Sequence, residues 1–118
     1  MTTDSRSSGP LFAANLLFRS SRNGVFGEDN LWEESLVLIE AGNTEEAERK
    51  AALLAVSKQS DYVAVDGAHV AWVFYKVERV FELLDLPLQH GAELFSRHLR
   101  NAEVQSLLTP FEDPSTQK

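Results

Sequence analysis

The fold is organised around the stretch LWEESLVLIEAGNTEEAERKAALLA, residues 31–55, which predicts a strand, a tight turn and an amphipathic helix. Gly42 interrupts the strand pattern, and Asn43 follows where a helix N-cap belongs. Glu46 stands three residues further on, at the spacing where a carboxylate reaches back to the cap's own amide. The helix then repeats apolar residues at i, i+4, i+7 and i+8, which predicts one side packed closely against a sheet. These residues are Ala47, Ala51, Leu54 and Ala55.

The strand within this stretch, residues 32–41, has apolar side chains on both parities near its middle. This pattern indicates an inner strand that is covered on both faces. Residues 11–19 alternate as a first strand. The dipeptide Asn23-Gly24 between them is a hairpin signal, so we expect the two strands to be antiparallel neighbours.

The rest of the chain supplies the remaining elements. We predict long strands at 69–83 and 92–99, a short extra strand at 62–65, and a small helix at 102–108. The expected fold class is therefore α+β, in the order β-β-α-β-β. The sheet is mainly antiparallel with four to five strands, one main helix packs on one of its faces, and a short helix ends the domain.

Length and composition define the class of protein. The chain has 118 residues, of which 43% are hydrophobic and 25% are charged, so we expect one domain, residues 11–110, between disordered tails at 1–10 and 111–118. The absence of cysteine excludes disulfides and thiolate metal sites, and it fits a reducing compartment. Because no apolar run has the length of a membrane span and no signal-peptide order is present, we expect a cytoplasmic protein without membrane contact.

The net charge of −7 is concentrated in residues 28–48, which carry eight acidic side chains and no basic one. Such a field repels phosphate backbones, so nucleic acid is not an expected partner, whereas a basic protein is a possible one. The alternative interpretation is that these acids form a solvated surface.

The run His69–Leu83 is too long for a regular strand, so we expect a bulge or bend within it. Its odd positions are apolar almost throughout, and we assign them to the side that faces the helix. Val70, Trp72 and Phe74 then lie on the opposite face. One helix cannot cover both faces, so the second face requires either the C-terminal segment or a second subunit.

Glu34 shares its strand face with Trp32 and is the main candidate for an acid or base. The structural alternative is that Glu34 pairs with Arg97 or Arg79 from another strand. The three histidines are far apart in sequence, and no metal-ligand spacing or phosphate loop is present. Ser96 and His98 share a face at two-residue spacing, about 7 Å, which is too far for a nucleophile and its base. We therefore expect no metal and no cofactor.

Four pieces of the sequence, taken together, resemble a known family. They are LFAANLLF (11–18), LWEESLVLIEAGNTEEAERKA (31–51), GAHVAWVFYKVERVFEL (67–83) and GAELFSR (91–97), and they cover most of residues 11–99. In this order and spacing they resemble the bacterial family of domains of unknown function numbered 4288. The resemblance implies a small, stand-alone bacterial α+β protein without an assigned activity, and it carries no catalytic residue over to this chain.

These observations favour a non-enzymatic binding or assembly module over an enzyme. The concrete expectation is a homodimer, or a complex with a protein partner, because aromatic side chains commonly anchor interfaces. Two alternatives remain open: an immunity-type protein that neutralises a basic toxin, and a small enzyme with a carboxylate and histidine site that uses Glu34, Arg97 and His98. The candidate binding residues are Trp32, Glu34, Val70, Trp72, Phe74 and Arg97.

Overall fold

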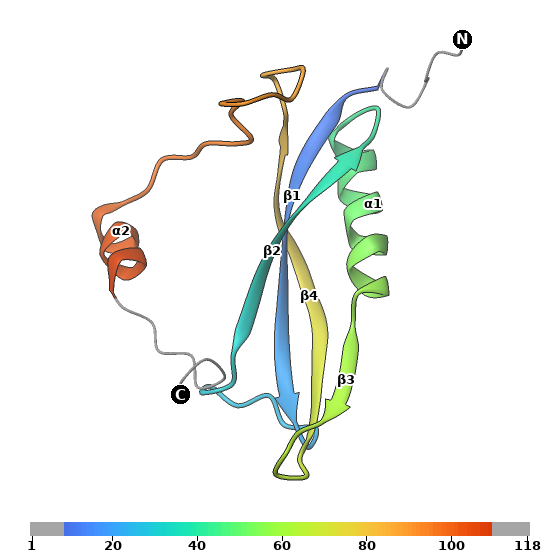
Figure 1. The fold of residues 1–118 in the computed structure, drawn as a ribbon, viewed down its shortest axis with the longest axis vertical. Coiled ribbons are helices and arrows are strands. Elements are labelled where there is room, and N and C mark those ends of the chain that lie inside the picture. Colours follow the sequence, from blue (N-terminus) through green and yellow to red (C-terminus); the bar gives the residue numbers. More distant parts are fainter. Residues whose placement is uncertain (1–8, 110–118) are drawn as a thin grey trace.

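The computed structural model describes residues 9–109, in which four strands form a single antiparallel sheet. The main helix, α1, runs along one face of this sheet, and the second helix, α2, lies on the other side at the end of an extended segment (Figure 1). The sheet order is β2-β1-β4-β3. The bounds are β1 Leu11–Arg22, β2 Trp32–Glu40, α1 Thr44–Ser57, β3 Ser60–Val63, β4 His69–Glu82 and α2 Asn101–Leu108.

The predicted α+β class and the two helices are confirmed, but the sheet has four strands. The strand expected at 62–65 is β3, two residues earlier, whereas residues 92–99 form neither strand nor helix. Most of this segment is exposed, and Phe95 anchors it by stacking on Phe81 of β4 with 5.0 Å between ring centroids. A segment held in this way needs no backbone pairing to show a period of two. The tails predicted at 1–10 and 111–118 lie almost entirely outside the described residues.

The core lies between α1 and the even-numbered residues of β1. Ala47, Ala51 and Ala55 form a fully buried stripe on α1, as the spacing predicts. Small side chains let the helix approach the sheet closely, so the larger apolar volume comes from the strands. The strand residues of this cluster are Phe12, Ala14, Leu16, Phe18 and Ile39, with Ala41 just after β2.

The start of α1 has the predicted cap. Asn43 Oδ1 accepts a hydrogen bond from the Glu46 amide at 2.8 Å. Glu46 Oε1 in turn accepts from the amide of Gly42 at 2.6 Å, one residue before the expected donor. This hydrogen bond, followed by the charges of Lys50 and Arg49, lowers the pKa of Glu46 below its ordinary value. Lys50 Nζ also donates to the carbonyl of Glu40 at 2.8 Å, which ties the helix to the end of β2.

The predicted turn at Asn23-Gly24 is confirmed. Asn23 and Gly24 have φ of +50° and +82°, and the flanking Arg22 and Val25 bond to each other across them. Positive φ at both central positions is the geometry that Asn-Gly favours in a tight turn. Gly67, with φ of +90°, supplies a positive-φ position in the turn between β3 and β4.

The face assignment predicted for β4 is wrong, because β4 contains irregularities at two places in its pairing with β1. Along the α1 side, Phe74, Val77 and Val80 follow one another at spacings of three instead of two. Each bulge shifts the alternation by one residue, so the same face holds even, odd and again even positions. Val70, Trp72 and Phe74 consequently lie on the α1 side of the sheet.

β2 is also placed differently from the prediction, because it is an edge strand. Its odd positions Val37 and Ile39 contact the core under α1, whereas Leu36 and Leu38 on the other side are 48% and 55% exposed. Apolar residues on both parities therefore indicate apolar surface above and below the strand. They do not indicate a neighbour on each side.

Candidate binding face

The candidate site is the side of the sheet that α1 leaves uncovered, called here the open face. The register pairs odd-numbered residues of β1 with partners on β2 and β4 that point to this same side. Its β1 residues are Ala13, Asn15, Leu17 and Arg19; β2 adds Trp32, Glu34, Leu36 and Leu38; β4 adds Val73, Lys76, Arg79 and Phe81. Three groups of side chains follow one another along this face.

The first group is the Arg19 cluster, which consists of Arg19, Phe26, Trp32 and Tyr75. The Arg19 guanidinium lies 4.2, 5.9 and 5.3 Å from the ring centroids of Phe26, Trp32 and Tyr75, respectively. Trp32 and Tyr75 meet edge to face at 5.0 Å. Cation–π contacts and the ring pair hold these side chains in one arrangement although the aromatic residues are about half exposed.

The second group is the Asn15 network, near the middle of the face. Asn15 is 4% exposed, and its Nδ2 donates to Glu34 Oε2 at 2.7 Å and to Glu78 Oε1 at 3.2 Å. Glu78 also pairs with Arg79 at 3.3 Å and lies 4.0 Å from Arg97. Two carboxylates and two guanidinium groups balance in charge. Glu34 does not pair with Arg97 or Arg79 as predicted. It accepts a hydrogen bond from the Asn15 amide instead, because both arginines lie next to Glu78.

The third group is an apolar groove, called here the leucine groove, between β2 and the segment that follows β4. This segment, the arm (residues 84–100), crosses one end of the open face and is anchored there by Phe95. The groove has a volume of about 250 Å³. It is lined by Ala13, Leu36, Val37, Leu38, Leu83, Leu88, Leu94 and Phe95.

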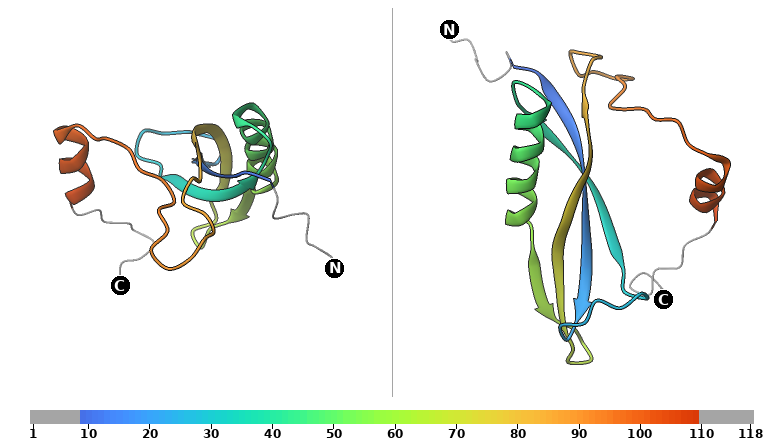
Figure 2. Two further views of the ribbon diagram at one scale, coloured as in Figure 1. Left: turned by 90° about the horizontal axis from the view of Figure 1, so that it is seen from above. Right: turned by 180° about the vertical axis from the view of Figure 1, so that it is seen from behind.

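The arm leads to α2, which stands away from the sheet on the side opposite α1 (Figure 2). No residue of α2 lies within 8 Å, between Cα atoms, of another described helix or strand. Leu107 and Leu108 are 68% and 71% exposed. The first turn is closed locally, since Glu103 bonds to the backbone and side chain of Arg100, and these bonds, with the nearby charges of Arg97 and Arg79, lower the pKa of Glu103.

The structure separates the predicted binding residues into two groups. Trp32, Glu34 and Arg97 converge on the open face, from β2 and from the arm. The other three lie on the α1 side, where Val70 is buried and both Trp72 and Phe74 pack against the core. Sequence reasoning missed Arg19, Asn15 and Glu78, and it assigned Tyr75, at an odd position of β4, to the α1 side. A signal for the first two was available, because a polar residue at 15 and a charged one at 19 share one parity of an otherwise apolar strand.

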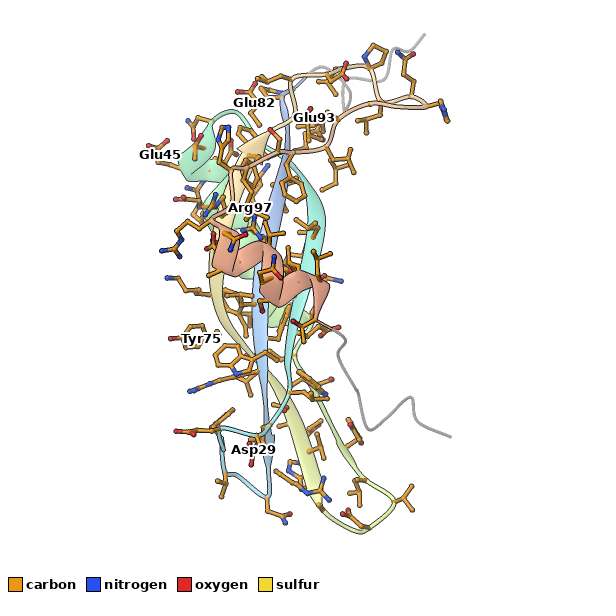
Figure 3. All side chains as sticks on the ribbon, turned by 90° about the vertical axis from the view of Figure 1, so that its left-hand side faces the viewer. Asp29, Glu45, Tyr75, Glu82, Glu93 and Arg97 are labelled. Carbon is orange, nitrogen blue, oxygen red and sulfur yellow. The ribbon has the colours of Figure 1, made fainter. Side chains whose placement is uncertain are left out.

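The acidic residues of 28–48 do not form one patch. Asp29 lies near one end of the long axis and Glu45 near the other, whereas Tyr75 and Arg97 lie between them (Figure 3). Among the described histidines, His69 pairs with Asp61 at 2.9 Å across β3 and β4. Residues 9–109 contain no group of three or more His, Cys, Asp or Glu side chains that could hold a metal ion. Within the same residues, no helix is long and apolar enough to cross a membrane.

The fold and the site define a small α+β protein with a four-stranded antiparallel sheet, one covered face and one open face. Residues 11–96 match the family described as Domain of unknown function (DUF4288), and the chain belongs to that family. This confirms the resemblance drawn from its four sequence pieces. Neither the curated proteins nor the solved structures gave a match.

Proposed function

We propose that this protein is a non-enzymatic binding module that uses the open face to hold a protein surface. The observation that carries the proposal is the Arg19 cluster. Tryptophan, tyrosine and arginine are the residues most enriched at the energetic centres of protein interfaces. Here they are already held against one another by ring and cation–π contacts, so binding costs little side-chain entropy.

The neighbouring groups fit the same role. The Asn15 network supplies polar groups whose charges are internally paired, and the leucine groove supplies apolar surface beside them. An interface of this kind combines an apolar contact area with polar groups of fixed position. A basic partner has less support, because the acids of 28–48 are spread along the molecule, with Asp29 and Glu45 near opposite ends of the long axis and Glu34 in the Asn15 network between them.

The test compares a double variant of the open face with a matched variant of the covered side. Trp32→Ala/Tyr75→Ala removes the ring pair, whereas Leu53→Ala/Val56→Ala removes two exposed apolar side chains of α1. Each full-length protein is immobilised and exposed to extract of the source cells and to the chain itself, with cross-linking to map the contacts. We expect a protein that is retained by the wild type and the α1 variant, lost from the open-face variant, and cross-linked beside the Arg19 cluster. Equal retention by all three proteins, or retention by none, contradicts the proposal.

A further inference from the structure

We infer that the partner of the open face is a second copy of this chain, with α2 of each copy seated in the leucine groove of the other. This inference rests on the proposed function, because it uses the open face as a binding surface. It adds the identity of the partner and the segment that makes the contact. The product is a reciprocal dimer in which the two α2 helices are exchanged and each arm stays on its own sheet.

Within residues 9–109, no other helix or strand approaches the apolar side of α2. Val104, Leu107 and Leu108 stand at i, i+3 and i+4 and so share one face of α2, while Ser106 points to the opposite side. Neither leucine is buried within its own chain. A short helix with such a stripe is normally stabilised by packing that stripe against another surface.

The open face contains a surface of the complementary kind. The leucine groove is lined almost entirely by apolar atoms, and its edge carries the half-exposed Leu36 and Leu38. An amphipathic helix laid into an apolar groove is a recurrent mode of recognition, and its anchors recur at i, i+3 and i+4. The stripe on α2 and the groove therefore match in chemistry and in spacing.

Charge supports the same placement. The first turn of α2 carries Glu103, and the Asn15 network beside the groove carries Arg79 and Arg97. Within its own chain both arginines lower the pKa of Glu103, and a second copy presents the same two guanidinium groups beside its groove. An acidic first turn next to two guanidinium groups orients the helix on the face.

The available area is that of an ordinary stable dimer. With about 100 Å² of side-chain surface for a leucine and about twice that for an aromatic ring, complete burial of the exposed apolar side chains of the open face, the arm and α2 removes at most on the order of 800 Å² from each copy. Standard interfaces bury about this much from each partner. Reciprocal exchange also makes the contact isologous, so the assembly closes at two copies.

The first experiment measures the mass of the full chain by light scattering at tens of micromolar. We expect twice the chain mass of 13.2 kDa. Leu107→Lys/Leu108→Lys should raise the dissociation constant of the dimer by about 100-fold or more, because two buried leucines are lost. Ser106→Lys, which adds one lysine on the opposite side of α2, should leave the mass of the dimer unchanged.

The second experiment distinguishes exchange of α2 from other ways of pairing. Leu38→Lys places a charge in the leucine groove and leaves the apolar side of α2 intact. Leu107→Lys/Leu108→Lys places charges on the apolar side of α2 and leaves the groove intact. Each variant alone should be a monomer. Their mixture retains one intact pair of helix and groove, so it should form a mixed dimer that is weaker than the wild-type one.

The inference is overturned by a monomeric wild type, by a dimer that survives Leu107→Lys/Leu108→Lys, or by variants that do not combine when mixed. None of these results contradicts the binding function itself. That function fails if the Trp32→Ala/Tyr75→Ala variant keeps every partner that the wild type binds, or if the wild type retains no protein at all.

Discussion

The two faces of this sheet differ in how completely they are covered. On the α1 side, Leu16 and Ala14 of β1 are fully buried under a stripe of helix alanines. On the open face, Leu36 and Leu38 of the neighbouring β2 remain about half exposed. The difference indicates that one face determines folding, and that the other can change without loss of the fold. Each prediction below tests this division.

The largest expected effect comes from truncating a leucine on each face. Leu16→Ala removes a fully buried side chain and should lower the free energy of unfolding by about 3 kcal/mol. Leu38→Ala should lower it by less than about 1 kcal/mol, because half of that side chain already contacts water. Urea unfolding followed by circular dichroism measures both values, at low protein concentration so that self-association does not contribute. Equal losses would mean that the two faces contribute equally to the free energy of unfolding.

The next effect comes from enlarging the helix stripe. Ala51 is fully buried against the strands, so Ala51→Leu forces α1 away from the sheet and should cost about 1–3 kcal/mol. Glu48→Leu places the same side chain on the exposed side of α1 and should change the stability by less than about 0.5 kcal/mol. The same unfolding assay compares the two variants. If Ala51→Leu is neutral, the helix is not packed closely on the sheet.

A smaller effect is expected for the one buried polar residue at the centre of the open face. Asn15→Ala removes the hydrogen bonds to Glu34 and Glu78 and should cost about 1–2 kcal/mol. The loss is limited because the Asn15 Oδ1 atom is buried without a hydrogen-bond partner among the described residues, and the substitution removes this penalty too. Glu34→Ala should matter less in the Asn15→Ala background than in the wild type. Additive losses in this double-mutant cycle would exclude the Asn15 network as a coupled unit.

Local chemistry allowed much of the fold to be predicted. The cap at Asn43, the alanine stripe of α1 and the turn at Asn23-Gly24 depend on residues close in sequence, and all three are confirmed. The predictions that were wrong concern the pairing of strands that are far apart in the sequence. Two bulges in β4 reversed the faces of Trp72 and its neighbours, and nothing in the residues of β4 alone marks where β1 stops matching it.

The candidate site was predicted in part for the same reason. Trp32 and Glu34 lie on a strand without bulges, so the prediction that they share a face is correct. The arm brings Arg97 to the same face. Tyr75 could not be assigned to the site, because its side of the sheet depends on the bulges next to it. Residues whose orientation depends only on a regular alternation were therefore placed correctly, and those beyond an irregularity were not.

The smallest predicted effect concerns the carboxylate that fixes the start of α1 on the covered side. The Gly42 amide and the charges of Lys50 and Arg49 lower the pKa of Glu46 below 4.5. Ionised Glu46 therefore favours the folded state above about pH 4.5, and this contribution is lost as the pH falls through the lowered pKa. Glu46→Gln should flatten the fall in stability over that acidic range and leave the open face unaffected.

A carbon-detected NMR titration of the Glu46 side chain checks the cause directly. Lys50→Met should raise the pKa of Glu46 towards 4.5 without reaching it, because the hydrogen bond from Gly42 remains and contributes most to the lowering. If Lys50→Met alone restores the ordinary value, the charge of Lys50 holds the carboxylate and the backbone bond does not. The start of α1 would then depend on a surface charge, which salt screens, and its attachment to the covered face would weaken as ionic strength rises.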